Sequence, residues 1–362
     1  MLTKPTSLTT LALQRFKKNK TGVFSFWYIV LCGFIAMFCY LIAPDNSNSA
    51  NLMHLEIHSK KPGFSTQMLT IPNDKKEQSF FNSLMFGKSS SNTEIPISSY
   101  QLTDKTLEVT LYSEGQRTKQ IKTYPLSNFE GDISKYISTK KFILGTDKYG
   151  RDLLSRMLIG TRISFSIGFI AVFISLIIGI SIGAIAGYYG GKIDDFIMWM
   201  INITWSIPTL LLVIAITLAL GKGFWQVFIA VGLTMWVEVA RVVRGQILST
   251  KQQQYVEAAK VLGFSDFRII FKHILPNIMA PVIVISAANF AAAILIESGL
   301  SFLGIGAQPP TPSWGAMIKD HYSYIIIGKA YLAIIPGLAI MSLVLAFMLI
   351  GNALRDALDV RS

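Results

Sequence analysis

The stretch ISFSIGFIAVFISLIIGISIGAIAG, residues 163–187, decides what kind of molecule this chain makes. It contains no charged side chain, and an α-helix of its length can cross the hydrocarbon core of a bilayer. Gly179, Gly183 and Gly187 recur within it at four-residue spacing. Glycines at that spacing share one helix face, where a second helix can approach closely and pack by van der Waals contact. The stretch therefore predicts a membrane-spanning helix that packs through a glycine face.

Further apolar segments on both sides have the same character. Together with the first stretch they give six expected spans, at residues 23–43, 163–187, 196–220, 224–243, 278–296 and 330–350. The composition agrees, because only 15% of the residues are charged, whereas soluble domains carry about a quarter. Pro208 lies inside the third span and Pro336 inside the sixth, and both should kink their helices, because proline removes a helical hydrogen bond. We therefore predict an all-α polytopic membrane protein with six transmembrane helices.

Basic residues next to the spans predict which way the chain crosses the membrane. They cluster in the loop at residues 241–273, and before the first span at Lys4, Arg15, Lys17, Lys18 and Lys20. Lysine and arginine are enriched in cytoplasmic loops. Residues 1–22 are then a cytoplasmic N-terminus, and an even number of spans returns the C-terminus to the cytoplasm. The net charge of +12 is explained in this way. No basic platform with aromatic residues indicates a nucleic-acid partner.

Residues 44–142 form a long polar segment, which we expect outside the membrane between the first two spans. Leu107, Val109 and Leu111 alternate with polar residues, and Glu114 and Gly115 follow at a natural turn. This pattern predicts a β-hairpin. The segment is either a small β-containing insertion or a partly ordered loop, and its sequence does not reveal its role. We expect no metal site among its histidines.

A second informative stretch, EAAKVLGFSDFRIIFKHILPN, occupies residues 257–277 between the fourth and fifth spans. Its first residues favour a helix, which Gly263 can end by taking a left-handed conformation. Ser265 or Asp266 can cap a second short helix, and Pro276 should close that helix just before the fifth span. We therefore expect two short helices with a sharp bend, held at the cytoplasmic face of the membrane.

The side chains of this stretch suit contact with a partner. The small side chains of Ala258 and Ala259 permit close approach, and the residues that supply an apolar face near the bend are Phe264, Phe267, Ile270 and Phe271. A bare EAAxxxG pattern occurs by chance in many helices. Its weight comes from the Leu275-Pro276 pair that follows it and from its place in a loop between spans.

Several runs together resemble one family of transport proteins. The runs are LGTDKYGRDLLSRMLIGTRIS at 144–164, GYYGGKIDD at 187–195, the stretch at 257–277, ESGLSFLGIGAQPPTPSWGAMI at 297–318, and LRDALDVR at 354–361. With these runs the chain resembles the C-type permease subunit of bacterial ABC importers of the dipeptide, oligopeptide and nickel family. The resemblance covers residues 141–362 and, more loosely, the first span. Residues 44–140 depart from it, since they are much longer than the equivalent loop in typical members.

The resemblance implies an architecture and a set of partners. Residues 143–362 would be a permease core with the type I importer fold, and residues 244–277 its coupling loop. A B-type permease subunit would complete the pathway, two ATPase subunits would hold ATP and Mg, and a solute-binding protein would deliver the substrate at a bacterial cytoplasmic (inner) membrane. The residues implied in ATPase coupling are Glu257, Ala258, Ala259, Gly263, Phe264, Phe267, Leu275 and Pro276. Oligopeptides or dipeptides are the implied substrates, with nickel chelates and antimicrobial peptides as alternatives.

The residues themselves agree with a transport subunit that hydrolyses no ATP. The sequence has no GxxxxGK[ST] phosphate loop, and GYYGGKI misses it in spacing and in its last residue. We therefore expect no catalytic residue and no cofactor on this chain. An ion-coupled carrier is the distant alternative, but spans two, three, five and six have no carboxylate or histidine near their middles. An intramembrane hydrolase would need a nucleophile motif such as GxSxG, which does not occur.

A few polar residues near the spans are candidates for a gate or a substrate pathway. Glu297 lies at the outer end of the fifth span and is a candidate for the outer gate, or for a structural hydrogen bond to the next loop. Asp147 and Arg151 belong to a short amphipathic stretch before the second span, which is either a packing element along the outer membrane face or part of a gate. Glu238 lies near the inner end of the fourth span, where a charge marks either a functional site or, as we expect, a helix end with a local ion pair to Arg241, three residues on.

Overall fold

The structure is a computed structural model that describes residues 8–72, 79–88, 92–113, 120–221 and 223–358. The chain divides into two compact units. The first unit contains Met1–Gly33, Ser164–Gln308 and Leu338–Ser362, and the second contains Phe34–Ile163 and Pro309–Gly337. Three long helices, α2 (Lys20–Ile42), α4 (Leu153–Tyr189) and α12 (Tyr331–Leu358), contribute residues to both units.

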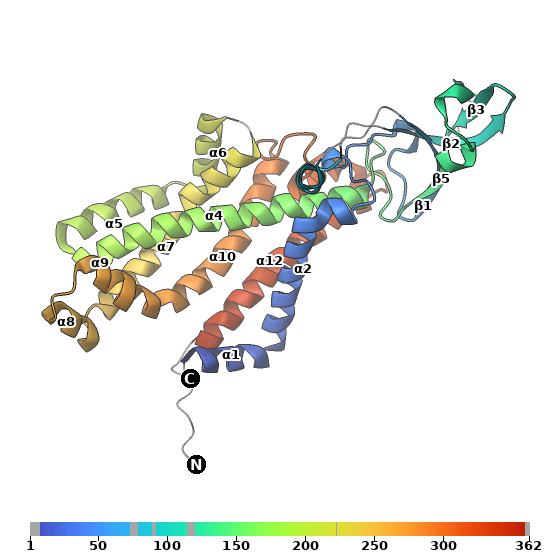
Figure 1. The fold of residues 1–362 in the computed structure, drawn as a ribbon. Coiled ribbons are helices and arrows are strands. Elements are labelled where there is room, and N and C mark those ends of the chain that lie inside the picture. The colour runs from blue at the N-terminus through green and yellow to red at the C-terminus, as the bar shows by residue number, and fades with distance from the viewer. Residues whose placement is uncertain (1–7, 73–78, 89–91, 114–119, 222, 359–362) are drawn as a thin grey trace, which may run out of the picture. The chain divides into compact units, whose positions relative to one another are not determined.

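The first unit is helical (Figure 1). Besides parts of α2, α4 and α12 it contains α1 (Leu8–Lys18), α5 (Gly191–Ser206), α6 (Thr209–Leu220), α7 (Phe224–Thr250), α8 (Gln254–Val261), α9 (Asp266–Arg268), the π-helical turn η5 (Ile269–Ile274) and α10 (Leu275–Phe302). Helix α7 is central, because it packs against α5, α6 and α10.

Five helices in the described part of the chain are long and apolar enough to cross a membrane: α2, α4, α7, α12 and the continuous stretch Asp266–Phe302. The expected third span is instead a bent pair, because α5 and α6 meet at 93°. The break falls at Ile207 and Pro208, where Ile207 is extended. A residue before proline avoids the helical region, so the kink predicted at Pro208 is confirmed. Whether the pair crosses as one span stays a prediction.

The glycine face of α4 packs against α7, as its spacing predicts. A Cβ atom added to Gly183 would lie 2.5 Å from the carbonyl oxygen of Ala240, and one added to Gly179 would lie 2.5 Å from Cβ of Val239. Gly187 faces Ile247 in the same way. The two backbones are therefore too close for any side chain at these positions.

The fifth span begins earlier than the sequence suggests. Pro276 does not close a short helix, because α9, η5 and α10 run without a break from Asp266 to Phe302. The π-helical turn explains the difference. The Leu275 N–H donates to the Ile270 carbonyl, five residues back, and this wider turn accommodates a proline that has no N–H of its own. The prediction for Pro276 was therefore wrong.

The second unit contains an antiparallel sheet with strand order β4-β3-β2-β1-β5. Its strands are β1 (Phe64–Ile71), β2 (Thr93–Leu102), β3 (Thr106–Leu111), β4 (Ile121–Pro125) and β5 (Ile137–Phe142). The alternating stretch forms β3 and pairs with β4, while the expected turn at Glu114 and Gly115 lies outside the described residues. Leu69, Ile97, Leu107, Val109 and Phe129 are buried together, so the sheet has a core of its own.

Short elements complete the second unit. They are η1 (Asn48–Ala50), η2 (Leu55–Ile57), α3 (Phe80–Phe86), η3 (Leu126–Asn128), η4 (Ile133–Tyr136), α11 (Trp314–His321) and η6 (Tyr322–Ile325). Helix α3 lies in the connection between β1 and β2, which are neighbours in the sheet.

Candidate functional site

The stretch at residues 257–277 folds as a helical hairpin whose bend depends on one glycine. Gly263 has a φ of +74°, which confirms the predicted left-handed conformation. The Gly263 N–H donates to the Lys260 carbonyl at 2.9 Å, and the Phe264 N–H donates to the Ala259 carbonyl at 3.1 Å. These bonds satisfy carbonyls that α8 would otherwise leave open at its end. A Cβ atom at residue 263 would meet nothing within 4 Å, so glycine is required here by its backbone conformation and not by lack of space.

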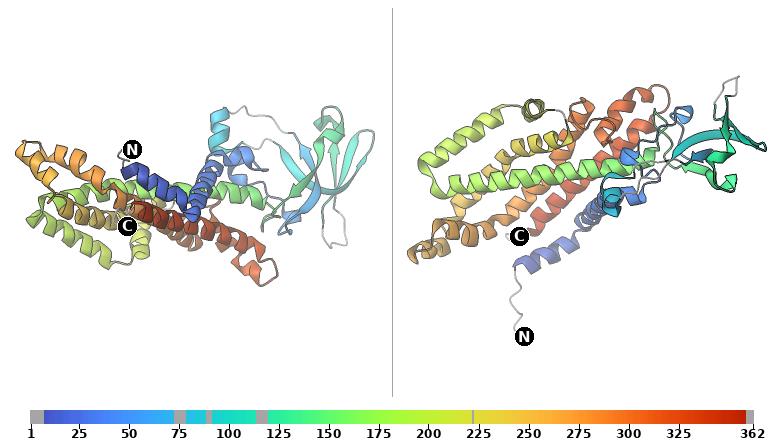
Figure 2. Two further views of the ribbon diagram at one scale, coloured as in Figure 1. Left: turned by 90° about the horizontal axis from the view of Figure 1, so that it is seen from below. Right: turned by 45° about the horizontal axis from the view of Figure 1, so that its top comes forward.

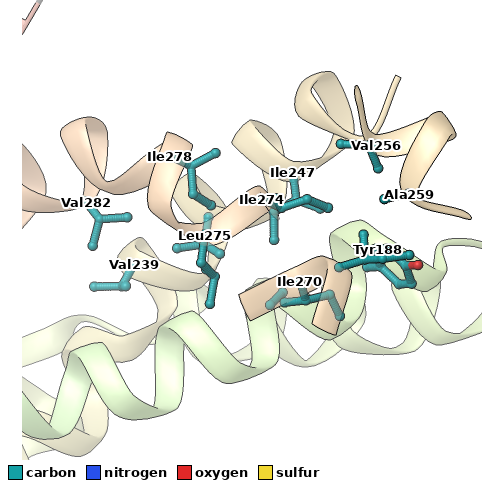
Figure 3. Close-up of a cluster of buried hydrophobic side chains, with 13 residues drawn as sticks. Tyr188, Val239, Ile247, Val256, Ala259, Ile270, Ile274, Leu275, Ile278 and Val282 are labelled. Atoms are coloured by element: carbon teal, nitrogen blue, oxygen red, sulfur yellow. The ribbon is translucent and has the colours of Figure 1, made fainter. Parts of the chain in front are cut away.

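One side of the hairpin is anchored by a buried apolar cluster (Figure 3). The labelled members come from α8, η5, α10, α7 and the end of α4: Val256, Ala259, Ile270, Ile274, Leu275, Ile278, Val282, Val239, Ile247 and Tyr188. The cluster therefore packs α8 and η5 directly against the spanning helices α4 and α7.

Polar contacts add to this anchor. The Tyr188 hydroxyl donates to Oδ1 of Asp266 at 2.7 Å, so the first residue of α9 is tied to the last turn of α4. The Lys260 ammonium lies 5.4 Å from the centre of the Tyr188 ring, within the range of a cation–π contact. Ser265 occupies the N-cap position, but its side chain makes no capping hydrogen bond. Asp266 therefore holds the bend through its hydrogen bond to Tyr188 on α4. The local sequence does not reveal this bond, because Tyr188 is far away along the chain.

The other side of the hairpin exposes apolar side chains. Val261 is 89% exposed, and Leu262 and Phe267 are each 71% exposed. The Phe267 and Phe271 rings contact each other at a tilt of 34°, with their centroids 4.3 Å apart, and Phe271 is 51% exposed. We call these four residues the bend patch. Exposed apolar patches of this kind mark surfaces that bind another molecule.

The sequence-predicted coupling residues divide between these two sides. Glu257, Ala258, Gly263, Phe267 and Pro276 are exposed, whereas Ala259 and Leu275 are buried in the cluster. Phe264 is half-buried between His273, which stacks on its ring, and the Arg268 guanidinium. Sequence reasoning missed Val261 and Leu262. Helical spacing could have found them. If Val256 and Ala259 form the buried face of α8, then Val261 and Leu262 do not share that face and should be exposed.

Glu297 is buried at 1% exposure. The Ser301 hydroxyl donates to Oε1 of Glu297 at 2.6 Å and accepts from the Ala307 N–H at 3.2 Å. Glu297 is thus linked through Ser301 to the loop that follows α10, which is the structural alternative raised by the sequence. A role of Glu297 in a gate or in substrate contact stays a prediction.

Asp147 and Arg151 form a buried ion pair in a tight turn before α4. The Arg151 Nε lies 2.7 Å from Oδ2 of Asp147. Oδ1 of Asp147 accepts hydrogen bonds from the N–H groups of Tyr149 and Arg151, at 2.8 and 3.0 Å. Both charged residues are less than 4% exposed. A carboxylate with this many donors holds the turn together. Whether the stretch lies along the membrane face or takes part in a gate stays a prediction.

Glu238 does not form the expected ion pair. No salt bridge joins it to Arg241, although both residues belong to the described part of the chain. The Arg241 guanidinium instead lies 3.8 Å from the centre of the Trp205 ring and donates to Oδ1 of Asn202 at 3.2 Å. Glu238 and Trp205 line a cavity of about 140 Å³. Helix α7 extends to Thr250, which puts Glu238 near the middle of this helix.

Two family models match the chain. The model described as "Binding-protein-dependent transport system inner membrane component" matches residues 179–361, and "N-terminal TM domain of oligopeptide transport permease C" matches residues 7–62. Neither match includes the sheet at residues 64–142.

Curated relatives match this chain over two thirds or more of their own length. The glutathione transport system permease protein of Pectobacterium atrosepticum is 43% identical over 216 residues, which cover 60% of this chain and 71% of the relative. The dipeptide transport system permease protein of Alkalihalophilus pseudofirmus is 43% identical over 59% of this chain and 70% of its own length. The dipeptide permease of Bacillus subtilis is 42% identical over 59% of this chain and 67% of its own length.

Solved structures resemble the chain more distantly. A structure of the MetNI methionine ABC transporter in an inward-facing conformation matches with a TM-score of 0.48 at 17% identity, over 57% of this chain and 97% of that one. An amino acid ABC transporter crystallised with histidines matches with a TM-score of 0.41 at 16% identity, over 56% of this chain and 94% of that one.

Proposed function

The chain belongs to the family of binding-protein-dependent transport system inner membrane components, and on that basis we propose that it forms half of the membrane pathway of an ATP-driven importer of short peptides. Two of the relatives above are named for dipeptides and one for glutathione, and both substrates are short peptides. A B-type permease subunit supplies the other half of the pathway. A solute-binding protein delivers the peptide, and two ATPase subunits hold ATP and Mg.

The observation that carries this proposal is the bend patch on an anchored hairpin. Its exposed apolar side chains suit the surface of a protein partner, while the opposite side of the same hairpin is buried against α4 and α7. A contact made at the patch is therefore passed to spanning helices. We propose that the patch and the exposed residues Glu257 and Ala258 contact an ATPase subunit. In this proposal Ala259, Leu275 and Phe264 support the contact from within.

The continuity of the fifth span supports the same mechanism. Since α9, η5 and α10 form one stretch from Asp266 to Phe302, a displacement of the bend moves α10 directly. A π-helical turn inside a helix is a place where function is often found, and here it carries the helix through Pro276 without a break. Rigid-body rocking of such helices would alternate the access of the pathway between the two sides of the membrane.

The proposed topology follows from the spans and the basic clusters. Residues 1–22 and the coupling loop at 244–277 are cytoplasmic, residues 44–142 lie outside, and residues 143–362 form the permease core. Glu297, Asp147 and Arg151 stay candidates for the outer gate. Their burial supports a role in holding the outer loops in place more than direct contact with substrate.

Reconstitution tests the energy source. The chain would be placed in proteoliposomes with the B-type subunit, ATPases and binding protein encoded beside it, and peptide uptake measured with internal ATP. We expect uptake of di- and tripeptides that requires ATP and persists when an uncoupler abolishes the ion gradient. Uptake that stops with the gradient and ignores ATP would instead identify an ion-coupled carrier. Uptake of a nickel chelate with no peptide transported would contradict the substrate class alone.

A further inference from the structure

We propose that helix α3 is a membrane anchor, which inserts its aromatic side chains into the lipid beside the carboxyl end of α2 and so tethers the sheet to the membrane surface. The sequence of α3 is FFNSLMF, and none of its residues is buried or charged. Phe81 is 75% exposed, and Phe80, Phe86 and Met85 are each more than half exposed. Three exposed phenylalanines in one short helix form an apolar patch of the kind that marks contact with a membrane or with another protein.

A single arginine fixes α3 to the spanning helix α2. The Arg162 guanidinium donates to the carbonyls of Met85 and Leu84 in α3, at 2.6 and 3.2 Å. It also donates to the carbonyls of Ala36 and Met37 in α2, at 2.8 and 2.9 Å. All these carbonyls are brought within reach of one planar group, so the last turn of α3 lies beside residues 36 and 37 of α2. Figure 2 shows α3, in cyan, next to the end of α2, in blue.

The guanidinium of Arg162 binds α2 next to an irregular residue. Phe38 departs from helical geometry, with φ −107° and ψ 18°. Arg162 donates to two carbonyls directly before this irregular residue, those of Ala36 and Met37. It also donates to carbonyls in the last turn of α3, which a helix end leaves without a helical partner.

The exit from α3 is fixed just beyond the end of α2. Gly87 has a φ of +79°, and a Cβ atom there would lie 2.7 Å from the Tyr40 ring. The Lys88 N–H donates to the Asn46 carbonyl at 2.8 Å, and the Asn48 N–H donates to the Lys88 carbonyl at 3.2 Å. These contacts do not involve Arg162, and they place the same end of α3 against the same part of the chain.

The depth of this contact argues for lipid as the partner. Ala36 and Met37 lie five to six residues before Ile42, the last residue of α2, which corresponds to roughly 8–9 Å along the helix. Interfacial helices bury their apolar face to about 5–10 Å. On α2, Phe34, Met37 and Leu41 are exposed. In this proposal the exposed apolar side chains of α2 and α3 enter the same lipid layer.

A depth measurement tests the anchor in the full chain. Cys32 and Cys39 are both buried and unpaired and would be replaced by alanine. A nitroxide would then be attached at Phe81→Cys, with the protein in phosphatidylcholine nanodiscs. We would compare how often the nitroxide collides with oxygen, which concentrates in lipid, and with a water-soluble nickel chelate. We expect the Phe81 label to have several-fold more contact with oxygen than with the chelate.

Two control labels calibrate the reading. A label at Phe173→Cys on the spanning helix α4, which is 59% exposed, serves as the lipid standard, and a label at Tyr100→Cys on β2, which is 43% exposed, serves as the water standard. A Phe81 label as open to the chelate as the Tyr100 label would overturn the proposal. A label that neither reagent reaches once the other subunits are bound would also overturn it, because the patch would then be covered by protein.

A change at Arg162 tests how α3 is positioned. In Arg162→Gln we expect the Phe81 label to gain several-fold access to the chelate, since the shared donor is lost. Limited proteolysis of the sheet would show that this variant is still folded. A folded variant with an unchanged label would contradict the role given to the guanidinium.

Discussion

Gly263 sets the bend of the hairpin through its backbone alone. Its φ of +74° is a conformation that costs an L-residue about 1–2 kcal/mol, while a Cβ atom there would point into open space. A substitution therefore strains or shifts the bend without disturbing the packed cluster on the other side. Glu257 differs, because it is exposed on α8 and is free to meet a partner.

We predict that Gly263→Leu and Glu257→Lys each reduce peptide uptake at least tenfold and leave the permease in the membrane. Tenfold corresponds to about 1.4 kcal/mol, and placing like charges opposite each other at a protein contact costs several kcal/mol. Uptake, pull-down of the ATPase subunits and substrate-stimulated ATP hydrolysis would be measured in the reconstituted complex. Gln252→Lys, at an exposed position outside α8, is the control for added charge. Wild-type uptake by both variants would show that the hairpin does not transmit ATPase motion.

The burial of His54 predicts that the stability of the second unit depends on pH. Burial lowers the pKa of its imidazole, Lys140 lowers it further, and Glu94, Glu56 and Asp45 oppose the shift. The folded state therefore keeps His54 neutral at pH values where the unfolded chain, with an ordinary pKa near 6.5, binds a proton. Linkage then makes the unfolding free energy decrease as the pH falls below that ordinary value.

We expect the wild-type Tm to decrease between pH 7.5 and pH 5.5, and the decrease to be smaller in His54→Gln. A loss of about 1 kcal/mol would lower the Tm by about 2–4 °C in a unit of this size. Thermal unfolding of the purified protein at both pH values gives the comparison. Equal decreases in the two proteins would mean that His54 does not contribute.

Among the elements, α4 and α7 depend on each other most directly. Their backbones meet along Gly179, Gly183 and Gly187, where the neighbouring atoms are mostly main-chain atoms or Cβ atoms. Such atoms cannot rotate away as the end of a flexible side chain can. The hairpin packs against the same two helices, so their packing also supports the coupling site that we propose.

We predict that Gly183→Val lowers the Tm or the yield of folded protein, because overpacking costs about 1–3 kcal/mol and the nearest atom is a carbonyl oxygen at 2.5 Å. Gly245→Val is the matched control. Gly245 also lies in a spanning helix, α7, but nothing lies within 4 Å of a Cβ added there. Thermal unfolding in detergent would compare the variants. Similar losses in both would attribute the effect to helix propensity and not to close packing.

At the scale of the whole molecule, the proposed topology predicts which residues can be reached from outside. In a background with Cys32 and Cys39 replaced by alanine, a cysteine at Tyr100 on the sheet should react with a membrane-impermeant maleimide in intact cells. A cysteine at Ser249, near the end of α7, should react only after the cells are broken. Labelling at Ser249 in intact cells would refute this topology.

The sequence by itself determined the features that depend on local chemistry. The length and apolarity of the runs predicted spanning helices, and the alternation at Leu107, Val109 and Leu111 predicted β3. The spacing of glycines predicted the face of α4 that meets α7, and Gly263 predicted a left-handed bend. Each of these follows from hydrophobic length, from side-chain period or from the backbone preference of one residue type.

Only the tertiary structure decided the features that depend on residues far apart in the chain. The π-helical turn before Pro276, the division of the coupling residues between a buried and an exposed side, and the burial of Asp147 with Arg151 all depend on surroundings that the local sequence does not state. Arg162 shows the reason most clearly. Its guanidinium donates to a carbonyl of α2 that is 126 residues away in sequence. Which acceptors a donor group finds depends on the residues that the fold brings close to it.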